Sequence, residues 1–159
     1  MIVKLPSRVL QVATLLFHDA ITESAAAMGI ARLFDPIGSA TCEDRPYMKE
    51  PDASYIPVNL QGRSDKWPTV VVESGFLKTI RRLRVDAEWW LVRSAGDVKV
   101  VIIIAVKRDE PEIIIENWIA DGNGPTCQQE IVISRTGQVI TVLGAPLTIT
   151  HEELLLQLN

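Results

Sequence analysis

Apolar segments rich in β-branched residues dominate the second half of the chain, and one stretch of helical periodicity interrupts them. PTVVVES (68–74) is typical of a buried central strand, and VKVVIIIAVKR (98–108) and PEIIIENWIAD (111–121) are predicted strands too. From Leu77, apolar residues instead recur every three or four positions, which predicts an amphipathic helix. Strands that alternate with a helix in this way indicate an α/β fold.

The helix predicted from Leu77 has two chemically different faces. Its apolar stripe is formed by Leu77, Ile80, Leu83, Ala87, Trp90 and Leu91, and its opposite face carries Lys78, Arg81, Arg82 and Glu88. Together with Arg84, the basic residues make the dense cationic cluster of the sequence. Such a cluster either contacts phosphates or forms a solvated helix face balanced by Asp86 and Glu88.

Helices are also predicted near both ends of the chain. The first follows an N-cap at Ser7, runs to about Met28 and is stopped by Gly29. The last is short and starts near Thr150, with Glu152 and Glu153 in its first turn. The other segments are predicted as strands at 39–43, 52–58 and 130–135, as loops at 43–51, 59–67 and 121–127, and as a hairpin turn at 136–138, while Gly75 is expected to break the strand before it.

Composition limits the class of protein. With 159 residues, 47% of them hydrophobic, the chain is expected to form one domain over 1–159. Sixteen basic and twenty acidic residues give a net charge of −4, which argues against a surface coated in positive charge but leaves room for a local basic patch. The longest apolar run, 100–106, is far shorter than the roughly 20 residues of a membrane span. We therefore expect a soluble intracellular protein, cytoplasmic or nuclear, that does not enter the membrane.

The two cysteines, Cys42 and Cys127, are too few for a disulfide framework. We interpret them as reduced thiols in the core or in loops, with a single disulfide as the alternative.

Two carboxylates lie where neighbouring strands are predicted to begin and end. Asp52 follows Pro51 at the start of one strand, and Glu73 closes the valine-rich strand, with 20 residues between them. Carboxylates in such positions can converge on one Mg²⁺ or Mn²⁺ ion, and Glu23 of the first helix could add a further ligand. Each has a structural alternative: a turn residue after proline for Asp52, an ion pair with Arg81 or Arg84 for Glu73, and a solvated helix face for Glu23.

The segments PDAS, WPTVVVESG, DAEWWL and VKVVII, in this order, resemble the PD-(D/E)XK, or restriction-endonuclease-like, superfamily. The resemblance covers roughly residues 7–108. More narrowly the chain is similar to a group of uncharacterised fungal proteins with this fold, and more remotely to small predicted bacterial endonucleases.

The resemblance implies a core of helix, three strands, helix and strand, to which this chain adds C-terminal strands and a short C-terminal helix. It also implies metal-dependent cleavage of nucleic acid, with Asp52 and Glu73 as Mg²⁺ or Mn²⁺ ligands and the backbone carbonyl of Ser74 as another. The superfamily's lysine position is Gly75 here, so Lys78 is the candidate replacement, with Arg82 one turn further along. Arg81 and Arg82 are the candidate contacts to nucleic acid.

A second function follows from the same residues. Gly75 in place of lysine, a pI near 5.2 and the absence of a broadly basic sequence favour an inactive nuclease fold that serves as a binding or assembly module. Apolar strands beyond residue 108 exceed what the core requires, and could form a homodimer face or cover a sheet edge. Convergence of Glu23, Asp52 and Glu73, with Lys78 pointing into the cluster, would favour the nuclease.

Overall fold

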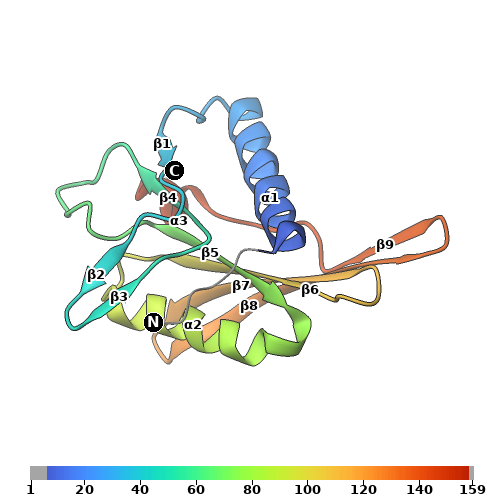
Figure 1. Ribbon diagram of the computed structural model, residues 1–159. Coiled ribbons are helices and arrows are strands. Elements are labelled where there is room, and N and C mark those ends of the chain that lie inside the picture. The colour runs from blue at the N-terminus through green and yellow to red at the C-terminus, as the bar shows by residue number, and fades with distance from the viewer. Residues whose placement is uncertain (1–6, 158–159) are drawn as a thin grey trace.

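A computed structural model describes residues 7–157, which form an α/β structure of three α-helices, a seven-stranded mixed sheet and a separate two-stranded hairpin (Figure 1). The domain predicted over 1–159 extends beyond this range at both ends. The helices are α1 (Arg8–Ala27), the 3₁₀ helix η1 (Leu77–Thr79), α2 (Ile80–Arg93) and α3 (His151–Leu155). The strands are β1 (Phe34–Pro36), β2 (Cys42–Asp44), β3 (Tyr47–Lys49), β4 (Ala53–Pro57), β5 (Val70–Phe76), β6 (Val100–Val106), β7 (Glu112–Asp121), β8 (Gly124–Thr136) and β9 (Val139–Leu143).

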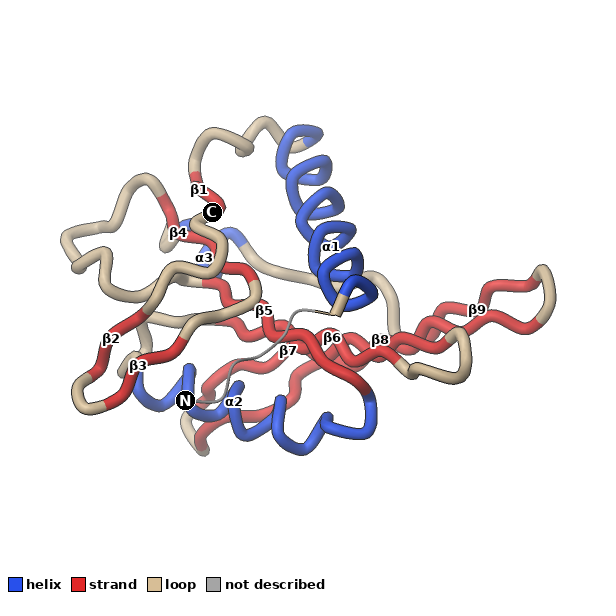
Figure 2. The backbone as a smooth tube through the Cα atoms, viewed as in Figure 1, coloured by secondary structure: helices blue, strands red, loops and turns tan. Residues whose placement is uncertain are grey.

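Most neighbouring strands of the large sheet are also consecutive in the sequence. Its strand order is β1-β4-β5-β6-β7-β8-β9, and its strands are drawn in red in Figure 2. The strands β5 and β6 are parallel, while every other neighbouring pair is antiparallel. The parallel pair needs a crossover connection, and η1 with α2 supplies it. The small hairpin β2–β3 is inserted between β1 and β4.

The parallel pair β5–β6 forms the centre of the core because helices cover both of its faces. All seven residues of β6 are buried, as are the first six of β5. The α1 side of the sheet packs Val70, Val72, Val100, Ile102 and Ile104 against α1 and α3, and the α2 side packs Val71, Val101, Ile103 and Ala105 against α2. Figure 1 shows α1 and α2 on opposite faces. Strands buried on both sides explain the continuous apolar runs in the sequence.

The predicted helices are confirmed. Ser7 is the N-cap residue of α1, the helix ends at Ala27, and Gly29 follows with a left-handed φ of +74°. In α2 the predicted stripe points inward, since Leu83, Ala87, Trp90 and Leu91 are buried. The opposite face, with Lys78, Arg81, Arg82 and Glu88, is exposed.

The last helix is fixed by its cap and by burial. The Thr150 hydroxyl accepts from the Glu153 backbone N–H at 3.2 Å, and the Glu153 carboxylate accepts from the Thr150 N–H at 2.6 Å. The same short helix buries Leu154 and Leu155 in the α1-side core. The Thr69 hydroxyl donates to the Leu154 carbonyl at 2.9 Å, which ties α3 to the strand that begins at Val70.

Four local predictions were wrong. The stretch 43–51 was predicted as a loop, but it contains β3 and the end of β2, because contacts from α2 hold this hairpin in place. Lys49 pairs with Asp86, and the guanidinium of Arg93 lies 4.6 Å from the centre of the Tyr47 ring.

Gly75 does not end its strand, because it pairs with Ala105 and β5 continues to Phe76. The strand predicted at 130–135 begins earlier, at Gly124, because β7 is long enough to pair with β8 from Gly124 to Ser134. The loop expected at 121–127 is reduced to a tight turn. The hairpin turn at 136–138 is confirmed by the pairing of β8 with β9.

Both cysteines are free, Cys42 buried and Cys127 exposed, so the single-disulfide alternative is wrong. None of the helices between residues 7 and 157 is long and apolar enough to cross a membrane.

We expect Thr150→Ala to lower the free energy of unfolding by about 1 kcal/mol, because α3 loses the side-chain acceptor of its capping box. Thr150→Ser, which keeps the hydroxyl, should retain most of the stability. Urea unfolding followed by circular dichroism measures both variants. Equal stability of Thr150→Ala and the wild type would show that burial of the two leucines alone holds α3 in place.

Candidate functional site

Asp52 joins the start of β4 to β5. Its backbone N–H donates to the Val72 carbonyl at 3.0 Å, which extends the ladder between the two strands by one bond. One carboxylate oxygen of Asp52 accepts from the Ser74 backbone N–H at 2.7 Å and from the Ser74 hydroxyl at 2.8 Å. The half-buried Asp52 side chain therefore lies beside the residue that follows Glu73.

Glu73 lies inside the core beneath α2. It is 2% exposed, and one carboxylate oxygen accepts from the indole N–H of the fully buried Trp90 at 2.7 Å. A buried carboxylate is costly unless hydrogen bonds satisfy it, so the Trp90 donor stabilises Glu73 where it is. Glu73 does not close its strand as predicted, because β5 continues to Phe76.

The two carboxylates approach β5 from different sides. Side chains alternate along a strand, so Glu73 shares the α2 side with Val71, while Ser74 shares the α1 side with Val72. Asp52 is bound to Ser74, and it also lines a pocket with residues of α1. The strand β5 therefore separates the Asp52 contact from the Glu73 carboxylate.

Glu23 is not brought to Glu73. It is exposed on α1, which covers the face of the sheet opposite to α2. Across residues 7–157, no three side chains of the histidine, cysteine, aspartate or glutamate types gather in a way that could hold a metal ion. The structure brings Asp52 next to Ser74 and leaves Glu23 and Glu73 on different sides of the sheet.

Leu83 fills the space in front of Gly75. A Cβ atom at position 75 would lie 3.0 Å and 3.2 Å from the two methyl groups of Leu83 and 3.3 Å from the Thr79 hydroxyl oxygen. These separations are shorter than ordinary van der Waals contacts. A side chain at position 75 would therefore require Leu83 to shift by a few tenths of an ångström and would disturb its packing under α2.

Three basic residues of η1 and α2 lie on the solvent side, whereas Arg84 reaches into the core. Lys78, Arg81 and Arg82 are exposed, on the face opposite to the buried stripe of α2. Arg84 contacts a different carboxylate, that of Glu116 on β7, through both its Nε and its Nη2 atoms. This hydrogen bond raises the pKa of the Arg84 guanidinium.

Two groups of interacting residues had not been anticipated from the sequence. Glu116 is fully buried and accepts from the indole of Trp118 at 2.7 Å in addition to Arg84. The sequence does contain a signal for this group, because Glu116 lies within the apolar run IIIENW. A glutamate in a buried strand requires a hydrogen-bonding partner. The second group is His18 and Tyr55, whose nearest polar atoms are 3.1 Å apart and whose rings stack.

His18 and Tyr55 border a pocket of about 280 Å³ between α1 and the β1–β4 edge. Asp52, Thr14 and Gly38 also line it. Burial is the main cause that raises the pKa of Tyr55 to about 12, and the charge of Asp19 adds to the effect. The phenol is therefore neutral over the physiological range and serves as a hydrogen-bonding partner of His18.

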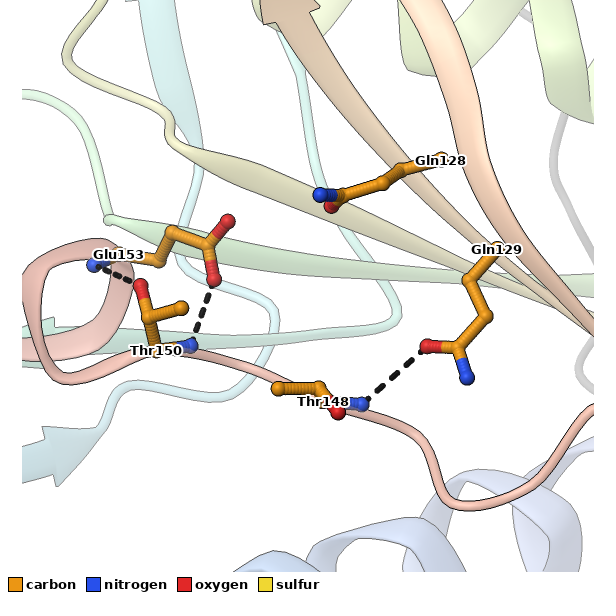
Figure 3. A pocket seen from close by; sticks show the side chains of 5 residues that line it. All are labelled: Gln128, Gln129, Thr148, Thr150 and Glu153. Carbon is orange, nitrogen blue, oxygen red and sulfur yellow. Dashed lines mark hydrogen bonds between the residues drawn. The ribbon is translucent and has the colours of Figure 1, made fainter.

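A second pocket, of about 260 Å³, lies between β8 and the segment before α3 (Figure 3). Several of its polar groups already bind one another or the neighbouring backbone. The Gln129 amide donates to the carbonyls of Gly144 and Pro146, and its oxygen accepts from the Thr148 N–H. Thr150 and Glu153 form the capping box of α3. These contacts anchor the C-terminal segment on the sheet, which is a structural role.

Comparison of the chain with protein-family models, with curated proteins and with solved structures finds no match. The geometry of the site is therefore the basis for inferring function.

We expect Gly75→Lys to lower the free energy of unfolding by about 1–3 kcal/mol, because the new side chain must displace Leu83. Leu83→Ala should cost about 2–5 kcal/mol on its own. The double variant should cost less than the sum, since the lysine stem occupies the cavity. Chemical unfolding of the four proteins gives the coupling.

Gly122→Lys is the matched control, because a Cβ at Gly122 meets no atom within 4 Å. If Gly75→Lys were as harmless as Gly122→Lys, the space in front of position 75 would not be closed.

The raised pKa of Tyr55 predicts a loss of stability at high pH. Below pH 10 the phenol is protonated in both folded and unfolded chains, so its contribution to the free energy of unfolding is fully present. Between pH 10 and about 12 the unfolded chain ionises first, so the free energy of unfolding should fall by up to about 1.4 kcal/mol per pH unit.

Tyr55→Phe should lack this slope, whereas Tyr47→Phe should keep it, because Tyr47 is 47% exposed. Unfolding titrations at several pH values compare the slopes. Identical slopes in all three proteins would contradict the assignment to Tyr55.

Proposed function

We propose that the chain is a restriction-endonuclease-like domain that has lost phosphodiester hydrolysis and serves as a binding or assembly module. The order α1, β1, β4, β5, α2, β6 supports the fold, since it is the helix, three strands, helix and strand that the resemblance implies. Asp52 opens β4 and Glu73 lies in β5, which are the second and third of those strands. The free thiols of Cys42 and Cys127 suit an intracellular location, cytoplasmic or nuclear.

The observation that carries the proposed loss of hydrolysis is the tight packing of Leu83 against Gly75, where the superfamily has its lysine. A lysine there would have to occupy the space of Leu83, and the exposed Lys78 lies on the far face of its helix. Glu73, under α2 and bonded to Trp90, is out of reach of a phosphate group in solvent. The donor set does not fit a shared Mg²⁺ or Mn²⁺ ion, because such an ion needs several oxygen ligands with room for water and phosphate.

A metal-dependent nuclease is the second candidate, favoured by the bonds between Asp52 and Ser74. These bonds place the aspartate of the PD motif beside the residue whose backbone carbonyl would be a ligand. In that case Asp52 and Glu73 would be the metal ligands, Lys78 the replacement lysine, and Arg81 and Arg82 the contacts to nucleic acid. Glu73 would have to leave its hydrogen bond to Trp90.

Calorimetric titration with Mn²⁺ separates the two functions. For the proposed module we expect no saturable binding at millimolar Mn²⁺ and no cleavage of single- or double-stranded DNA or RNA. Saturable binding by the wild type that disappears in both Asp52→Asn and Glu73→Gln, accompanied by cleavage, would establish the nuclease. Circular dichroism must show that both variants remain folded, and Glu23→Gln is the control for an exposed carboxylate of α1.

A further inference from the structure

Strand β9 is an exposed apolar edge. It is the outermost strand of the sheet, and Figure 1 shows the β8–β9 hairpin extending to the side, beyond the helices. All five residues of β9 are exposed. The exposed fractions of its four large apolar side chains are 65% for Val139, 66% for Ile140, 48% for Val142 and 63% for Leu143. Neither face of this strand is therefore covered by the rest of the described chain.

The apolar residues occupy both faces of β9. By strand alternation, Ile140 and Val142 point to one face, and Val139, Thr141 and Leu143 point to the other. A solvated edge strand normally carries a lysine, a proline or a bulge that prevents pairing with another chain. The sequence 136–150 has no charged residue, and β9 pairs with β8 in continuous register from Thr136–Val139 to Val132–Leu143.

The backbone of β9 is oriented for a further strand. Thr136 pairs with Val139 across a two-residue turn, Gly137–Gln138, in which Gly137 has a φ of +60°. Hydrogen-bonded and non-hydrogen-bonded pairs alternate from such a closing pair. The peptide groups of Val139, Thr141 and Leu143 then bond to β8, and those of Ile140 and Val142 point outward.

We infer that β9 pairs antiparallel with β9 of a second copy of this chain, which joins two sheets across a twofold axis at Thr141. In this register Ile140 bonds to the partner's Val142, and the partner's Leu143 lies opposite Val139. Each apolar side chain then meets an apolar side chain on the same face, and all five residues pair. If the twofold axis lay one residue to either side, at Ile140 or Val142, only three residues of each β9 strand would pair.

A second copy is the partner that the charges favour. A charged segment would find no opposite charge between residues 136 and 150, whereas a neutral strand pairs with itself without repulsion. The contact is also small. A standard interface buries about 800 Å² on each partner, and one five-residue edge provides less, so we expect a dimer with a dissociation constant in the micromolar range or weaker.

This inference rests on the proposed assembly function, but its test involves neither metal nor nucleic acid. If no dimer forms, the proposed loss of hydrolysis is unaffected, because the Mn²⁺ titration tests it independently.

Sedimentation equilibrium from about 1 μM to about 1 mM protein brackets dissociation constants of this size. We expect a reversible monomer–dimer equilibrium, weakened by at least about tenfold in Val142→Lys because a charge on an edge strand blocks pairing. Val85→Lys is the matched control, since Val85 is a 62% exposed valine on α2. A monomer at every concentration would overturn the inference. So would a dimer that survives Val142→Lys and is lost in Leu16→Lys, on the exposed apolar face of α1.

Cysteine cross-linking tests the register. In a background with Cys127→Ser, which removes the exposed native thiol, Thr141→Cys should give a disulfide-linked dimer under mild oxidation. Opposed non-hydrogen-bonded residues have Cα atoms about 4.5 Å apart, within the range of a disulfide. Val139→Cys lies on the same face, but its partner copy would be about 13 Å away, four residues along the strand direction. Equal cross-linking of the two variants would contradict an axis at Thr141.

Discussion

The parallel contact between β5 and β6 is the constraint on which the rest of the structure depends. Each of these strands is buried on both faces, and burial of one Val or Ile side chain contributes about 1.5–3 kcal/mol. Two covered faces require helices on opposite sides, and α1 and α2 provide them. The crossover from β5 to β6 runs through η1 and α2, so the position of α2 follows from the same contact.

Burial under α2 also decides the state of the acidic residues. Glu73 accepts from Trp90, and Glu116, on the same side of the sheet, accepts from Trp118 and Arg84. Both glutamates accept a hydrogen bond from a buried tryptophan, which lowers the cost of burying a carboxylate. Glu73, which the proposed resemblance would make a cation ligand, is part of the core, and Leu83 packs tightly against Gly75 two residues further along β5. These contacts are the basis of the proposal that the chain does not hydrolyse phosphodiesters.

The C-terminal strands differ sharply in how far they are covered. Trp118 of β7 and Ile131 of β8 are buried, whereas the whole of β9 is exposed. The helices and loops that cover the centre of the sheet therefore do not cover its last strand. The apolar strands beyond residue 108 therefore end in β9, an exposed apolar edge strand whose pairing with β8 is in continuous register.

The sequence by itself determined the local structure. The stripe of α2, the glycine stop after α1 and the capping box of α3 depend on residues within a turn or two, so their patterns predicted the elements. Tertiary structure alone decided which side of β5 Glu73 would occupy, that Leu83 would fill the space at Gly75, and that α2 would hold the β2–β3 hairpin. The reason is physical: those outcomes depend on residues distant in the chain, and period-two alternation gives two opposite faces without saying which helix covers each.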